Sequence, residues 1–141
     1  MPVSTAILSP VVALLLLTSV VWAWMYATRI PAIGKLGMKL DANLPNGQQM
    51  SELPPRGRWK ADHYNHLLQQ PVMFYAIALT LALLGAGEGL NLTLAWWYVG
   101  LRVVHTLHQT LWNKIEIRFV LFSLSSLVLI ALIVRAALLI W

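Results

Sequence analysis

Four polar side chains recur along one apolar stretch in the second half of the chain. Arg102, His105, Gln109 and Asn113 follow one another at intervals of three, four and four residues. On an α-helix this spacing places them on one face. Ionisable side chains within an apolar span are costly, and they usually face the interior of a bundle or a watery cavity. The stripe therefore predicts a polar site inside a helical bundle.

A second polar stripe lies on the preceding apolar stretch. Its members form two pairs, each one helical turn apart: Asn65 with Gln69, and His66 with Gln70. Because both stripes lie toward the same end of their spans, we expect the two helices to meet there and line a common polar site.

Two further cations lie at the same level, at the start of the last apolar stretch. Lys114 and Arg118, together with Arg102 and the nearby amide donors, suit a carboxylate or a thiolate at the membrane edge. Alternatively, Arg102 pairs with a side chain of another helix and serves packing. The residues alone favour the two readings about equally, so both stay open here.

The four histidines invite a comparison with metal sites. His63 and His66 are three residues apart, as are His105 and His108, and imidazole is a common metal ligand. However, the ligand set is incomplete, and polar helix ends explain four histidines equally well. The chain has no cysteine to complete a site. We therefore predict no metal site.

The elements that position these residues follow from the composition. Of 141 residues, 59% are hydrophobic and 11% charged, against about 25% charged in an ordinary soluble domain. Four apolar runs are long enough to cross a bilayer at about 1.5 Å per residue. The sequence thus predicts an all-α integral membrane protein, one domain over residues 1–141. Its four-transmembrane-helix bundle would have spans at 6–28, 64–87, 90–112 and 119–141.

The distribution of charge predicts the topology. The net charge is +5, and the polar loop 29–62 holds six Lys or Arg residues, whereas the turn between the second and third runs holds none. The positive-inside rule places loop 29–62 in the cytoplasm and both termini outside it. We expect a bacterial inner membrane. The positive charge lacks the basic and aromatic pattern of a nucleic-acid site, so no nucleic-acid partner is expected.

Three segments together resemble one family. They are residues 65–76 (NHLLQQPVMFYA), residues 97–106 (WYVGLRVVHT), and Asn113 with residues 117–119 (IRF). In combination, and with the chain length and the long polar first loop, they are similar to the MAPEG family, the membrane-associated proteins of eicosanoid and glutathione metabolism.

The resemblance implies a fold, a cofactor and a set of roles. It implies a homotrimer of four-helix bundles in the lipid bilayer. Glutathione would lie between subunits near the cytoplasmic face, beside a lipophilic substrate taken from the membrane. Arg118 would be the catalytic residue, close to the glutathione sulfur, because a cation stabilises the thiolate nucleophile. The remaining glutathione-binding positions would be Arg102, Asn65, His66, Gln69, His105, Asn113 and Lys114.

The chain departs from the family pattern at the second span. The position of a glutathione-binding Glu falls on Gln69, and the neighbouring Asn position falls on His66. Gln69 keeps an amide but loses the charge, so we expect weaker glutathione binding. The leading hypothesis is a membrane-embedded glutathione-dependent transferase or peroxidase acting on lipophilic electrophiles or lipid hydroperoxides. The alternative is a catalytically degenerate MAPEG-fold protein that binds a lipid or a partner without glutathione chemistry.

Overall fold

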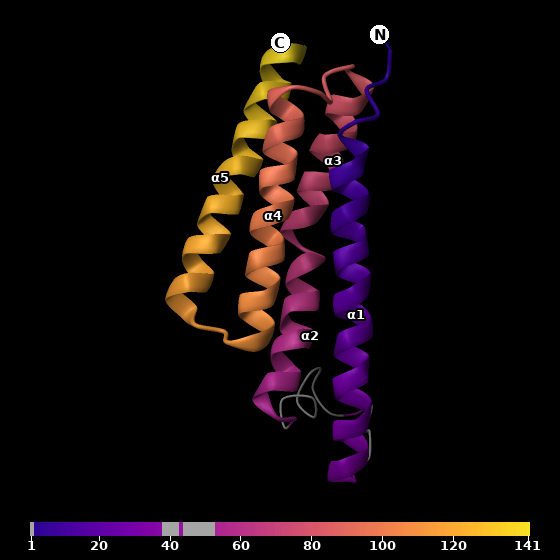
Figure 1. Ribbon diagram of the computed structural model, residues 1–141, viewed down its shortest axis with the longest axis vertical. Coiled ribbons are helices and arrows are strands. Elements are labelled where there is room, and N and C mark those ends of the chain that lie inside the picture. Colours follow the sequence, from indigo (N-terminus) through magenta and orange to yellow (C-terminus); the bar gives the residue numbers. More distant parts are fainter. Residues whose placement is uncertain (1, 38–42, 44–52) are drawn as a thin grey trace.

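The computed structural model describes residues 2–37, 43 and 53–141, and their regular structure is helical. The helices run side by side along the long axis of the molecule, and both chain ends lie at the same end of the bundle (Figure 1). Helix α4 packs against α1, α2 and α5, so it forms the inner element of the bundle. The helices are α1 (Leu8–Leu36), α2 (Pro55–Leu67), α3 (Gln70–Leu83), α4 (Leu90–Leu111) and α5 (Ile115–Ile140).

Three stretches among the described residues are long and apolar enough to cross a membrane. They are Leu8–Lys35, Arg58–Leu83 and Ile115–Ile140. Apolar side chains cover much of the outer surface, and on α5 Leu127 and Leu138 are 63% and 76% exposed. A surface of this kind suits lipid rather than water. The chain is therefore a membrane protein.

Helix α4 differs from those three stretches. Its 22 residues correspond to a length of about 33 Å, but its polar stripe lowers its hydropathy. The span predicted at 90–112, which would bring the number of spans to four, thus stays a prediction.

The first helix is longer than the sequence predicted. We expected a span at 6–28 and a loop from residue 29, but α1 continues through Pro31 to Leu36. It ends where Gly37 takes a left-handed conformation (φ 61°) and donates its N–H to the carbonyl of Gly34, because glycine adopts this conformation without a Cβ clash. Of the predicted loop 29–62, residues 38–42 and 44–52 lie outside the described residues.

The second predicted span is two helices rather than one. Helix α2 already begins at Pro55, before the expected start at residue 64, and ends at Leu67; α3 follows from Gln70 to Leu83. The break has a cause in the sequence, because Pro71 has no N–H to donate to the preceding turn. The break lies beside the polar side chains described below.

The other two connections also differ from the predicted boundaries. Helix α3 ends at Leu83, ahead of the expected residue 87, and the following turn contains Gly85 and Gly89 with positive φ. Helix α5 begins at Ile115 rather than at 119. The turn before it contains Asn113, the one non-glycine residue with positive φ in the described chain. Asparagine tolerates this conformation better than most residues.

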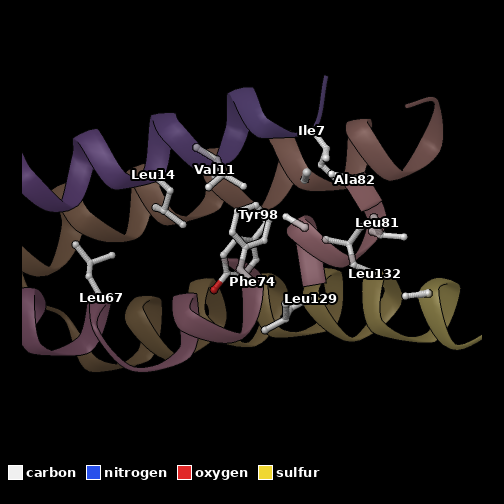
Figure 2. Packing of buried hydrophobic residues seen from close by; sticks show 14 of the residues in the cluster. Ile7, Val11, Leu14, Leu67, Phe74, Leu81, Ala82, Tyr98, Leu129 and Leu132 are labelled. Carbon is white, nitrogen blue, oxygen red and sulfur yellow. The ribbon is translucent and has the colours of Figure 1, made fainter. Parts of the chain in front are cut away.

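The apolar core lies in the half of the bundle that holds the chain ends. Figure 2 shows side chains of α1, α3, α4 and α5 meeting there, among them Leu14, Phe74 and Leu132. The rings of Phe74 and Tyr98 stack with centroids 4.6 Å apart and an interplanar angle of 16°. Tyr98 is fully buried, and its hydroxyl marks the border with the polar half.

Candidate functional site

Arg102 lies at the centre of the polar half and is 0% exposed. Its Nε donates to the hydroxyl of Tyr98 at 3.2 Å, its Nη1 donates to Nε2 of His66 at 2.7 Å, and its Nη2 donates to Oε1 of Gln70. Gln70 in turn donates from Nε2 to the hydroxyl of Ser126 at 2.8 Å. These hydrogen bonds connect α4 with α2, α3 and α5, so Arg102 fixes the relative positions of four helices.

The bond from Arg102 determines the tautomer of His66. A guanidinium group has only donors, so Nε2 of His66 must accept and is not protonated. The ring proton of a neutral His66 then lies on Nδ1, which has no partner in the described part of the chain. His66 therefore presents a hydrogen-bond donor with a fixed orientation.

His63 is held by two side chains of α4. Its Nδ1 lies 2.7 Å from Oε1 of Gln109, and its Nε2 lies 2.6 Å from Oγ1 of Thr106. The Thr106 hydroxyl donates to the backbone carbonyl of Arg102 at 2.7 Å. The side chain of His63 is fully buried. These contacts add a second polar connection between α2 and α4.

His105 packs against both histidines of α2. Its ring centroid lies 5.1 Å from that of His66 and 5.2 Å from that of His63. Its Nδ1 is buried and has no hydrogen-bond partner among the described residues. The three rings gather, and the nitrogens of His63 and His66 bond to different side chains. Within the described residues, no group of three or more His, Cys, Asp or Glu residues is arranged to hold a metal ion.

In this polar half, α2, α4 and α5 line an open cavity of about 550 Å³, which we call the α2–α4–α5 cavity. Polar side chains come from α2, α4 and the break after α2, and α5 contributes three apolar side chains and Arg118. The lining residues are Asp62, Asn65, His66, Gln69, His105, Gln109, Ile115, Arg118, Phe119 and Phe122.

Arg118 brings a half-buried cation to this cavity. Its Nη1 donates to Oδ1 of Asn113 at 2.8 Å, and its other nitrogens have no partner in the described part of the chain. The turn that carries Asn113 is itself held, because the backbone N–H of Lys114 donates to Nε2 of His108 at 3.1 Å. The guanidinium group is thus oriented on one side and open to a ligand on the other.

The predicted site residues divide into two groups. One group lines the cavity: Asn65, His66, Gln69, His105 and Arg118.

The other predicted residues lie outside the lining. Arg102 lies behind His66 and contacts it. Asn113 orients Arg118. Lys114 is exposed and contributes its backbone N–H to the turn.

Several lining residues were missed, although the sequence carried signals for them. Asp62 precedes His66 by four residues and so shares its helix face. Gln109 belongs to the predicted polar stripe. On α5 the apolar lining residues Ile115 and Phe122 lie three and four residues from Arg118, and Phe119 lies four residues after Ile115. We had not predicted Gln70 as the partner of Arg102, because that contact depends on the break between α2 and α3.

One of three comparisons with known proteins found a match. Neither the search of curated proteins nor that of solved structures found a match. A family model, the MAPEG family, matches residues 7–138, which is nearly the whole chain. The chain belongs to the MAPEG family.

Proposed function

We propose that this protein is a membrane-embedded glutathione-dependent transferase or peroxidase, and that the α2–α4–α5 cavity is its glutathione site. The observation that carries the proposal is Arg118, which lines this cavity with free guanidinium nitrogens and is oriented by Asn113. Glutathione supplies a thiol whose thiolate form is the nucleophile. A guanidinium group beside the sulfur favours the thiolate over the thiol.

The rest of the lining fits a tripeptide that has both carboxylate groups and an ammonium group. The Nδ1–H of His66 and the side-chain amides of Asn65 and Gln69 can donate to carboxylates. Asp62 supplies the carboxylate that the sequence lacks at Gln69, so we assign the ammonium group of glutathione to Asp62. Arg102 does not line the cavity; we assign it the positioning of His66.

The α5 side of the cavity suits a lipophilic second substrate. Ile115 and Phe119 line it and are each 69% exposed on the outside of the bundle. A substrate dissolved in the bilayer would reach the thiolate along these side chains. We propose lipophilic electrophiles or lipid hydroperoxides as the substrate class, because an apolar lining selects apolar molecules.

The assembly and the orientation are also part of the proposal. Asn65 and Gln69 line the cavity but are exposed in the single chain, so a second subunit would close it, as in a homotrimer. The start of α5, which lines the cavity, lies on the side of the bundle away from the two chain ends (Figure 1). By the positive-inside rule this side faces the cytoplasm. The termini would then lie outside the cytoplasm, and we propose a bacterial inner membrane.

The first test is a thermal-shift titration with glutathione on detergent-purified protein. A ligand that binds only the folded state stabilises it by about 2.7 kcal/mol at a hundredfold excess over its Kd. We expect a dose-dependent rise of the midpoint in the wild type and in Lys114→Ala, whose side chain is outside the cavity lining. We expect the rise to be lost in Arg118→Ala. No rise in the wild type at millimolar glutathione would favour the alternative, a MAPEG-fold protein without glutathione chemistry.

A further inference from the structure

A second polar site lies at the opposite end of the bundle, where α5 passes the turn between α3 and α4. There a cavity of about 340 Å³ is lined by one cation, one anion, one amide and three apolar residues. The lining residues are Arg135, Glu88, Asn91, Ala86, Leu138 and Leu139. None of them takes part in the glutathione site proposed above, so this cavity requires a separate explanation.

Arg135 is held in place by a buried side chain. Its Nε donates to Oδ1 of Asn91, which is only 4% exposed. The Nδ2 of Asn91 donates to the carbonyl of Ala86 at 2.8 Å, which fixes the amide. An arginine that merely reaches toward the headgroup region needs no such support. Here the support leaves Nη1 and Nη2 without a partner in the described part of the chain. Two parallel N–H donors of this kind match two oxygens of a phosphate.

Glu88 places a negative charge in the same cavity. Although both residues line it, no ion pair joins Glu88 to Arg135 among the described residues. A cavity with a separate cation and anion complements a ligand with a separate anion and cation. Beside the charges, Leu138 and Leu139 are 76% and 57% exposed, on a surface that suits acyl chains.

We propose that this cavity binds the headgroup of a zwitterionic aminophospholipid. The phosphate accepts from Nη1 and Nη2 of Arg135, the primary ammonium donates to the Glu88 carboxylate, and the acyl chains lie along Leu138 and Leu139. A primary ammonium fits this role better than a trimethylated one, because it has N–H donors for a carboxylate. Such a lipid would anchor the end of α5 to the turn between α3 and α4.

Binding of defined lipids to the full-length protein in detergent tests this assignment. Phosphatidylethanolamine, phosphatidylcholine and phosphatidylglycerol would be titrated separately and followed by native mass spectrometry. We expect phosphatidylethanolamine to bind roughly tenfold more tightly than the other two, the difference of one charge-assisted hydrogen bond. Equal binding of the three lipids would overturn the proposal. Equal binding of free phosphoethanolamine would overturn the lipid as the ligand and leave a soluble phosphate ester.

Two variants separate the roles of the two charges. Glu88→Gln should remove the preference for phosphatidylethanolamine over phosphatidylglycerol but keep phosphate binding. Arg135→Lys keeps the positive charge but loses the bidentate pair of N–H donors, and it should weaken the binding of every phospholipid. Glu116 is an exposed carboxylate at the start of α5, so Glu116→Gln is the matched control. It should change neither the preference for phosphatidylethanolamine nor the affinity for phospholipids. A preference for phosphatidylethanolamine that survives Glu88→Gln would overturn the proposal.

Discussion

The two halves of this bundle are held together by different forces. In the half with the chain ends, apolar side chains such as Leu14, Phe74 and Leu132 interdigitate. In the other half, Arg102 and His63 hold the helices through hydrogen bonds between side chains. In the second half, the contacts between helices therefore depend on polar groups that find no equivalent partners in lipid.

This contrast shows where the specificity of the arrangement resides. Lipid tails are as apolar as leucine, so burying leucine against another helix gains packing but little hydrophobic free energy. A buried guanidinium without partners is far more costly. The orientation of α2 against α4 should therefore depend on Arg102 more than on any single apolar contact. The cavity that we assign to glutathione lies on this more specific side.

The largest expected effect is that of Arg102→Met. The variant removes the three N–H groups that donate to Tyr98, His66 and Gln70, and it leaves Nε2 of His66 without a partner. We expect the free energy of unfolding in detergent to fall by about 3 kcal/mol or more. Arg118→Met, which removes one bond at the cavity edge, is the matched control and should cost less than about 1 kcal/mol. A similar loss in both variants would remove the distinction between the two arginines.

Phe74→Ala measures the apolar half in the same assay. The substitution empties a site that is 0% exposed and removes the stacking on Tyr98. We expect a loss of about 2 kcal/mol, less than the loss of about 3–5 kcal/mol in soluble cores, because lipid also solvates the unpacked ring. If Phe74→Ala costs more than Arg102→Met, the ranking of the two halves is wrong.

Asp62→Asn tests the charge of the cavity rather than its stability. An exposed carboxylate contributes modestly, so the variant should raise the Kd of glutathione roughly fivefold. It should leave the Kd of N-acetylglutathione, which lacks the ammonium, unchanged. Isothermal titration calorimetry with both ligands makes the comparison. Equal losses for both ligands would exclude Asp62 as the ammonium partner while leaving glutathione binding itself intact.

The smallest effect concerns the second polar connection between α2 and α4. Thr106→Val removes the hydroxyl beside Nε2 of His63 and should cost about 1 kcal/mol. Thr93→Val is a close control, because that hydroxyl also donates to a carbonyl four residues earlier, that of Gly89, but is exposed. Thermal midpoints of the two variants should therefore differ, and a Thr106→Val midpoint equal to that of Thr93→Val would show that this connection contributes nothing.

The sequence was informative about which residues would meet. Helical spacing predicted that the polar stripes of residues 65–70 and 102–113 would share a site, and the structure brings His66 against Arg102 and His105. The start of the last span was informative too, because Arg118 lies at the cavity. These features follow from periodicity and from the cost of polar groups in an apolar bundle.

The depth of a side chain within the bundle and the position of a helix break were harder to predict. Spacing places Arg102 on a face but does not say whether it reaches a cavity or lies behind another side chain. The answer depends on Pro71, which breaks the predicted second span and brings Gln70 to the guanidinium group. The extension of α1 to Leu36 was missed because the charge-free apolar run ends at Arg29, whereas the helix continues beyond it.

The most direct measurement of the central claim is the ultraviolet absorbance of the glutathione thiolate on the protein. Difference spectra at neutral pH would compare bound with free glutathione for the wild type, Arg118→Gln and the control Lys114→Gln. We predict a thiolate band for the wild type and Lys114→Gln and its loss in Arg118→Gln. Bound glutathione that shows no thiolate band in the wild type, or an equal band in Arg118→Gln, would contradict the role that we assign to Arg118.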